Sequence, residues 1–254
     1  MPHDLLRALA IFAAGLAAGT INTVVGSGTL ITFPTLLAFG YPPVLANVSN
    51  NVGLVPGTMS GAYGYRAELA GQRRRVIRLG AASLGGGLVG AIALLELPAD
   101  AFKAIVPVLI GIALVLVVAQ PWLAKRLAAR PDGSTHAEGG VALLLGIFAT
   151  GIYGGYFGAA QGVLLLGLMG SLLNEDLQRI NAAKNILAVL VNGVAAIVFL
   201  FVAPIDWTAA LLIAIGSVVG GQIGARVGRR LPPVALRGLI VVVGLVAIAK
   251  LLLG

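Results

Sequence analysis

Apolar residues fill most of the chain in long blocks that charged residues rarely interrupt. Blocks without any charged residue include 11–65, 79–95, 141–174, 186–205, 207–225 and 238–249. A transmembrane helix needs about 20 consecutive, mostly apolar residues, and most of these blocks are close to that length or longer. The pattern predicts a polytopic helical membrane protein, with evident spans at about 48–65, 78–96, 103–122, 182–203, 207–226 and 234–252.

The first apolar stretch, residues 5–39, is too long for one crossing. As a single helix it would be about 50 Å long, against a hydrocarbon core of roughly 30 Å. Its middle reads GTINTVVGSGTLITFP (19–34), and the glycines and short polar residues there weaken a helix. We therefore expect a helix, a glycine-rich break and a short returning half-helix. The same arrangement recurs at 141–153, 154–162 and 163–173.

The recurrence extends to the rest of the chain. A shift of 134 residues places Ser83–Ala101 over Ser217–Ala235 with eight of nineteen positions identical, and it places NVSNN (47–51) over NAAKN (181–185). A two-residue adjustment then aligns GTINTVVGSG, from residue 19, with GIYGGYFGAA, from residue 151. The chain therefore reads as two tandem halves, repeat one at 1–130 and repeat two at 135–254.

Loop charge indicates that the two halves are inverted. The loop at 66–78 carries five arginines, whereas its counterpart at 202–207 carries no Lys or Arg. The next pair of loops reverses the bias: 96–100 has no Lys or Arg, and its counterpart carries Arg226, Arg229 and Arg230. Since Arg and Lys concentrate in cytoplasmic loops, equivalent loops lie on opposite faces. Each half then crosses an odd number of times, so each opening hairpin contributes either no crossing or two.

The expected fold is therefore an all-α polytopic membrane protein with two inverted repeats. Each repeat is a broken or re-entrant helix hairpin plus three transmembrane helices, and residues 1–254 form a single transmembrane domain. We expect it in the plasma (inner) membrane, with the lipid bilayer as its surroundings. The sequence makes no prediction of oligomeric state, transport direction or coupling ion.

Composition narrows the function. The chain is 59% hydrophobic and 10% charged, with a mean hydropathy of +1.01, which excludes an ordinary soluble domain. The net charge of +8 comes from short loops between spans, so it indicates membrane orientation and not nucleic-acid binding. The chain has no cysteine, and its two histidines lie in loops without ligand-like companions. We expect no metal, no cofactor and no enzymatic activity.

Two inverted helix breaks near the membrane midplane suit an anion. The N-terminus of a half-helix carries unpaired N–H groups and partial positive charge, and secondary transporters use such breaks as binding sites. Every Asp and Glu falls in a predicted loop or terminus, so no mid-span carboxylate repels an anion. Amides and hydroxyls beside the breaks can donate hydrogen bonds to oxyanion oxygens. The candidate substrate-binding residues are Asn22, Thr23, Gly26, Ser27, Gly28, Thr29, Asn47, Asn50, Asn51, Tyr153, Gly158, Gln161, Gly162, Asn181, Lys184 and Asn185.

Plainer interpretations exist for several of these residues. The glycines can serve only close helix packing, and Tyr153 can serve interfacial or core packing. Lys184 replaces Asn50 across the repeat and is the one candidate full positive charge near the site. Alternatively, its side chain snorkels to the cytoplasmic interface.

Several motifs resemble those of the TauE/SafE sulfite-exporter family. They are the pattern GxxxxxxGxGxLxxxP followed by ANVSNNV in the first half, and GGYFGAAQGVLLL followed by NAAKN in the second. The chain departs from the family pattern at Ser27 and Thr29, within the first glycine run, and at Ala160 in the second. The resemblance covers essentially the whole chain and implies transport of sulfite, sulfoacetate, thiosulfate or another small organosulfonate or sulfur oxyanion. The alternative is a membrane partner subunit that transports nothing by itself.

Overall fold

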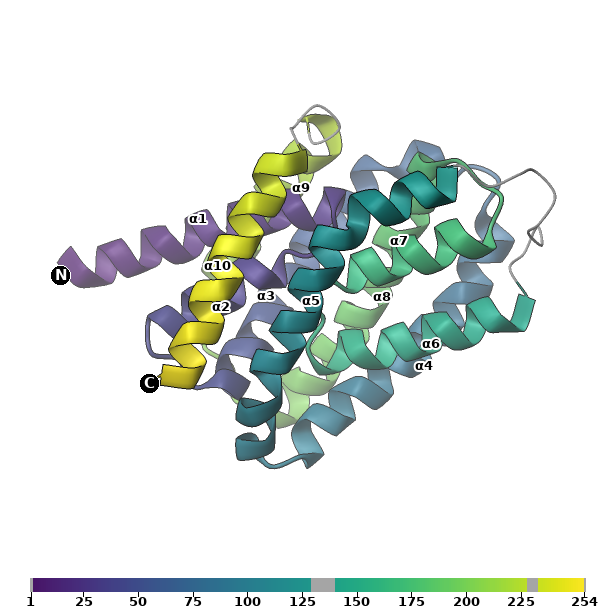
Figure 1. Ribbon diagram of the computed structural model, residues 1–254. Helices are drawn as coiled ribbons and strands as arrows, with labels where there is room; N and C mark the ends of the chain where they lie inside the picture. Colours follow the sequence, from purple (N-terminus) through teal and green to yellow (C-terminus); the bar gives the residue numbers. More distant parts are fainter. Residues whose placement is uncertain (1, 129–139, 228–232, 254) are drawn as a thin grey trace.

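The computed structural model describes residues 2–128, 140–227 and 233–253, and within these it is helical throughout. The junction between the two predicted repeats, at 130–135, lies outside the described residues, as do Arg229 and Arg230. In chain order the elements are α1 (Pro2–Val24), α2 (Thr29–Ala38), α3 (Pro43–Gly64), the short 3₁₀ helix η1 (Arg66–Leu69), α4 (Arg73–Glu96), α5 (Ala99–Ala128), α6 (Gly140–Tyr156), α7 (Gln161–Leu172), α8 (Leu177–Val202), α9 (Trp207–Val227) and α10 (Pro233–Leu253) (Figure 1).

The helices confirm the predicted all-α membrane architecture. Five are long and apolar enough to cross a membrane, at Asp4–Val24, Arg73–Glu96, Ala99–Trp122, Leu177–Val202 and Trp207–Arg226. α3 and α10 also form where spans were predicted, but they are not among these five. Polar residues such as Asn47, Asn50 and Asn51 lower the hydropathy of α3, and the qualifying stretch of α10 is short.

Both predicted breaks exist, and the second is shorter than expected. α1 ends at Val24 and α2 begins at Thr29, while α6 ends at Tyr156 and α7 begins at Gln161. The sequence predicted a break from Gly154, yet Gly154 and Gly155 stay helical. Gly155 lies so close to α4 that an added Cβ would collide with the Gly87 carbonyl, so this glycine serves helix packing and not a break.

Each half packs its glycine-rich helix on the broken helix of the other half. α4 lies along α6, and α9 lies along α1. A Cβ added to Gly86 would collide with the Phe148 carbonyl, and one added to Gly220 would collide with the Leu16 carbonyl. These two contacts join equivalent positions of the repeat. The Gly86–Gly90 and Gly220–Gly224 stretches thus allow backbones to approach closely, as small residues do in membranes.

Equivalent helices α3 and α8 run in opposite directions. At one end, the Asp206 N–H, which follows α8, donates to Ser49 Oγ near the start of α3 at 2.9 Å. At the other end, Tyr65, which follows α3, belongs to a buried cluster with Ala182 near the start of α8. This antiparallel contact favours inverted repeats, although membrane topology stays a prediction.

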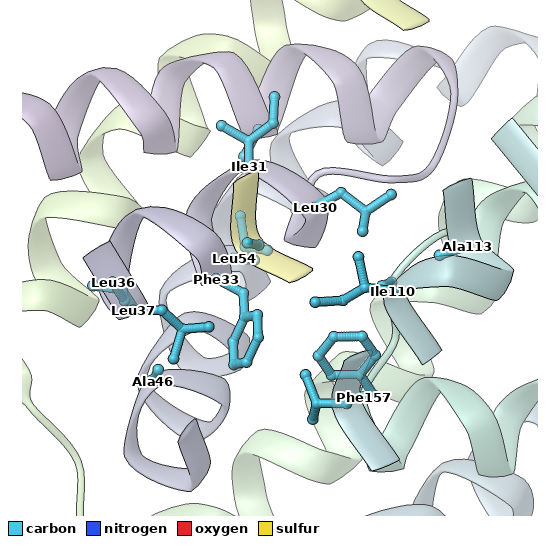
Figure 2. Close-up of a cluster of buried hydrophobic side chains, with 14 of the residues drawn as sticks. Leu30, Ile31, Phe33, Leu36, Leu37, Ala46, Leu54, Ile110, Ala113 and Phe157 are labelled. Carbon is cyan, nitrogen blue, oxygen red and sulfur yellow. The ribbon is translucent and has the colours of Figure 1, made fainter. Parts of the chain in front are cut away.

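An apolar core surrounds the first break and reaches the second. Figure 2 shows Phe33 of α2 and Phe157 of the second break lying close together, with Ile110 of α5 nearby. The Phe33 and Phe157 rings meet edge to face, with centroids 5.2 Å apart, and Phe102 packs against Phe157 from α5. This packing fixes the position of the second break relative to α2 and α5.

Candidate functional site

Both broken helices end in the same way. Gly26 has φ +86° and Gly158 has φ +76°, the left-handed region that favours glycine. The Gly26 N–H donates to the Ile21 carbonyl at 3.1 Å, and the Gly158 N–H donates to the Tyr153 carbonyl at 3.0 Å. In each case the acceptor is five residues earlier, so the two breaks share the same backbone hydrogen-bond pattern. Gly26 and Gly158 therefore end α1 and α6.

The two breaks touch each other through backbone atoms. The Gly162 N–H donates to the Gly26 carbonyl at 3.0 Å. A Cβ on Gly26 would collide with Gly162 Cα, and a Cβ on Gly162 would collide with Gly26 Cα. Close packing, the plainer interpretation, therefore applies to this pair. The same two residues also line a cavity, so the close contact between the breaks forms part of the cavity wall.

A small polar cavity lies beside the contact between the breaks. Nine of the sixteen predicted site residues line it: Asn22, Gly26, Thr29, Asn50, Asn51, Gly158, Gln161, Gly162 and Lys184. They come from α1, α2, α3, α7, α8 and the two breaks, so residues from both halves meet at one place. The remaining lining residues, Leu54, Phe157, Ala188 and Asn192, were not predicted.

The other seven predicted residues lie outside the cavity lining: Thr23, Ser27, Gly28, Asn47, Tyr153, Asn181 and Asn185. Most of them support the backbone near the breaks. The Thr23 carbonyl accepts from the side-chain amides of Asn181 at 3.4 Å and Asn185 at 3.5 Å. In the other half, Asn47 Nδ2 donates to the Tyr156 carbonyl at 3.0 Å. Amides on α3 and α8 thus satisfy carbonyls at the C-terminal end of the broken helix of the opposite half.

Tyr153 and Gly28 hold the breaks in place. The Tyr153 hydroxyl donates to the Ala159 carbonyl, inside the second break. A Cβ on Gly28 would come within 2.5 Å of the Ala18 carbonyl, so this residue allows the first break to lie against α1. Neither residue lines the cavity, so a direct substrate contact of Tyr153 or Gly28 stays a prediction.

Lys184 is fully buried and does not snorkel to the interface. Its side chain has 0% exposure, and Nζ donates to the Asn22 carbonyl at 3.1 Å and to the Thr23 carbonyl at 3.2 Å. These carbonyls lie at the C-terminal end of α1, where the helix dipole is negative. An ammonium group has three N–H donors, so one is left for a ligand. Within the described residues, Lys184 has no carboxylate partner.

Further polar atoms of residues in or near the cavity have no protein partner within the described residues. Gln161 is 3% exposed and its Nε2 makes no hydrogen bond in the described part of the chain. Asn51 Oδ1 and Ser27 Oγ are likewise buried without a partner there. Asn50 is engaged, since its carboxamide contacts the hydroxyls of Thr32 and Thr29. Buried polar groups nearly always find a partner, so these unsatisfied atoms mark room for a polar ligand.

Carboxylates stay away from the cavity. None of the seven described acids lines it, and the other two, Asp132 and Glu138, lie outside the described residues. Glu175 instead joins the halves at the end of the bundle near η1, where it accepts from Arg75 and Arg179, each at 2.7 Å. Burial raises the pKa of Glu175, but these hydrogen bonds outweigh it and hold the pKa below its ordinary value of 4.5. The described residues contain no cluster of His, Cys, Asp and Glu able to hold a metal.

Comparison with known proteins relates nearly the whole chain to a family. The family described as "Sulfite exporter TauE/SafE" matches residues 11–251. The chain is 27% identical over 242 residues to "Probable membrane transporter protein ORF9" of Sinorhizobium sp, covering 95% of this chain and 91% of the relative. It is 26% identical over 258 residues to "Probable membrane transporter protein YfcA" of Escherichia coli (strain K12), covering 99% and 91%. It is also 26% identical over 250 residues to "Probable membrane transporter protein YdhB" of Bacillus subtilis (strain 168), covering 98% and 99%. No solved structure matches the chain significantly.

Proposed function

The chain belongs to the sulfite exporter TauE/SafE family of membrane transporters, and from this premise we propose that it carries a small sulfur-containing oxyanion across the plasma membrane. Sulfite is the first candidate, and sulfoacetate, thiosulfate and other organosulfonates are the related ones. The anion occupies the cavity beside the two helix breaks. The protein acts as a secondary transporter, without a catalytic step.

The fully buried Lys184 side chain, whose Nζ contacts only backbone carbonyls within the described residues, is the observation that carries this proposal. A buried charge is costly unless it is paired, and two backbone carbonyls supply only partial negative charge. A bound anion supplies the missing countercharge at the remaining N–H of Lys184. A positive charge on Lys184 also repels a cation from the same cavity. No carboxylate of the described residues lines the cavity to offset this repulsion.

The neutral donors fit an oxyanion as well. Gln161 Nε2 is an N–H donor without a partner, and Thr29 adds a hydroxyl to the lining. The amide of Asn51 presents either its oxygen or its NH₂ to the cavity, since the two ends of an amide are nearly indistinguishable in shape. Sulfite has three oxygens that accept such hydrogen bonds. A site with one lysine and several side-chain amides can bind sulfite without placing a second charged side chain in the membrane.

Position between the two halves supports transport and not simple storage. The site lies where the breaks of the predicted inverted repeats meet, and in secondary transporters this is the fixed point about which the halves move. Rocking of one half against the other would expose the cavity to each side in turn. The alternative function, a partner subunit that transports nothing alone, assigns no role to an uncompensated cation in a cavity.

The test uses purified protein in liposomes with radiolabelled sulfite. We expect the parent protein to move sulfite and to bind it, and Lys184→Met to bind it about 10–100-fold more weakly, the effect of losing a hydrogen bond to a charged ligand. Lys103→Met, which removes an exposed lysine of α5, is the matched control and should behave like the parent. A folded parent that neither binds nor moves sulfite would instead support the partner-subunit alternative.

A further inference from the structure

Lys184 is the one ionisable side chain in the lining of the cavity, within the part of the chain that the structure describes. The other lining residues are amides, one threonine, glycines and apolar residues. Among the described residues, no other Lys or Arg belongs to the buried interior. The side chains around the cavity therefore contribute at most one positive charge.

The half-helices that start beside the cavity add few free N–H groups. At the start of α7, the first four N–H groups all donate to protein carbonyls at 3.0–3.4 Å, namely those of Gln161, Gly162, Val163 and Leu164. At the start of α2, three N–H groups donate to the Ser27 and Gly28 carbonyls at 2.9–3.4 Å, namely those of Leu30, Ile31 and Thr32. Each break also brings the positive start of one helix close to the negative end of another, and the two dipoles offset each other. The backbone therefore supplies little further compensation for negative charge.

We propose that this site selects oxyanions with a single negative charge over dianions. The inference rests on the proposed function and narrows its substrate class. An anion with one charge balances the Lys184 ammonium and leaves the occupied cavity neutral. A dianion leaves an unpaired negative charge inside the membrane, which is costly. Hydrogensulfite and simple alkanesulfonates carry one negative charge, whereas the sulfite dianion, sulfate, thiosulfate and sulfoacetate carry two.

Competition at a fixed pH tests this selectivity on the purified protein in detergent. Unlabelled methanesulfonate or sulfate is used to displace radiolabelled sulfite while the ionic strength is held constant. The two competitors share a tetrahedral sulfur with three oxygens. The fourth substituent is a methyl group in methanesulfonate and an oxygen with a second negative charge in sulfate. We expect methanesulfonate to displace the label at concentrations about tenfold or more below those of sulfate.

A second cation in the cavity should shift this preference towards the dianion. Asn192→Lys places an amine on the same cavity wall, about two helical turns after Lys184 and at a partly buried position. We expect sulfate to gain about tenfold or more relative to methanesulfonate in this variant. Thr208→Lys adds the same charge at the exposed start of α9, outside the cavity lining, and is the control that should keep the parent's ratio.

Two results would overturn the single-charge selectivity. One is that sulfate and methanesulfonate compete within about threefold of each other in the parent protein. The other is a ratio in folded Asn192→Lys within about threefold of the parent's ratio. The comparison in the parent decides the matter by itself where this variant does not fold. A parent that binds labelled sulfite but prefers sulfate defeats this inference alone, whereas a parent that binds no sulfite defeats the proposed function as well.

Discussion

The Gly162 N–H donates a 3.0 Å hydrogen bond to the Gly26 carbonyl, which ties the helix break of one half to that of the other. Because Gly162 is the second residue of α7, this bond uses one of the free N–H groups at the start of that helix. An anion in the proposed site therefore cannot bind at this N–H. It has to rely on side chains around the contact, chiefly Lys184 and Gln161.

Replacing either glycine of this contact by alanine should destabilise the protein. In Gly162→Ala the new methyl group collides with backbone, and in Gly26→Ala the left-handed φ of +86° adds a cost of about 1–2 kcal/mol. Thermal unfolding in detergent measures the effect. Gly111→Ala on α5, where a Cβ meets nothing within 4 Å, is the control and should not lower stability. Unchanged stability of Gly162→Ala would contradict the contact.

Asn51→Ala and Asn185→Ala should separate binding from stability, although the two residues are equivalent in the repeat. Asn51 lines the cavity and its side-chain NH₂ is a hydrogen-bond donor for an anion, so its loss should weaken sulfite binding roughly ten-fold or more. Asn185 donates to the Thr23 carbonyl outside the cavity lining, so its loss should lower stability by about 1 kcal/mol with little change in affinity. Calorimetry and thermal unfolding of both variants give the comparison. Equal affinity losses would place Asn185 in the binding site as well.

Glu175→Gln should lower stability in a pH-dependent way. The pKa of Glu175 lies below 4.5 in the folded protein, so the carboxylate contributes stability above pH 4.5 and loses it as the pH falls through the folded pKa. The variant should therefore unfold more easily at pH 7, by about 1 kcal/mol, and the difference should shrink well below pH 4.5. Glu96→Gln, at the exposed end of α4, is the control. A difference that grows in acid would contradict the assigned role of Arg75 and Arg179.

Membrane topology can be tested without removing any native cysteine, because the chain has none. Single cysteines at Ala70→Cys, Thr208→Cys and Arg226→Cys all lie at exposed positions. An impermeant maleimide added to intact cells should label only Thr208→Cys, because the arginine-rich ends face the cytoplasm. Labelling of Ala70→Cys but not Arg226→Cys, or the reverse, would refute the inverted repeats.

Most of the fold could be predicted because membrane helices leave strong signals in sequence. Apolar length located the spans, and the glycine-rich interruptions located both breaks to within a few residues. The sequence misplaced the start of the second break, since Gly154 and Gly155 look like break residues and instead pack inside α6. The sequence does not distinguish a glycine that permits close helix contact from a glycine that ends a helix, because the difference depends on the neighbouring helix.

The sequence predicted which polar residues lie near the breaks, but not which of them line the cavity. Several polar residues near the breaks line one cavity. Others do not: the side chains of Asn47, Asn181 and Asn185 donate hydrogen bonds to backbone carbonyls, including that of Thr23. Their amides satisfy the ends of α1 and α6, a need that depends on three-dimensional neighbours. Asn192, another lining residue, was not predicted, because it lies in the middle of α8 and far along the chain from both glycine-rich breaks.

α1 packs against α9, which is synthesised about 200 residues later, at contacts such as Leu16 with Gly220. Much of the chain must therefore be synthesised before this contact can form. At about 5–20 residues per second, the ribosome needs roughly 10–40 s to make that stretch. Throughout this interval the face of α1 that carries Gly15 and Gly19 has only lipid or the insertion machinery beside it. Neither half is therefore a folding unit by itself, and a chain cut before α9 leaves α1 in the membrane without its neighbour.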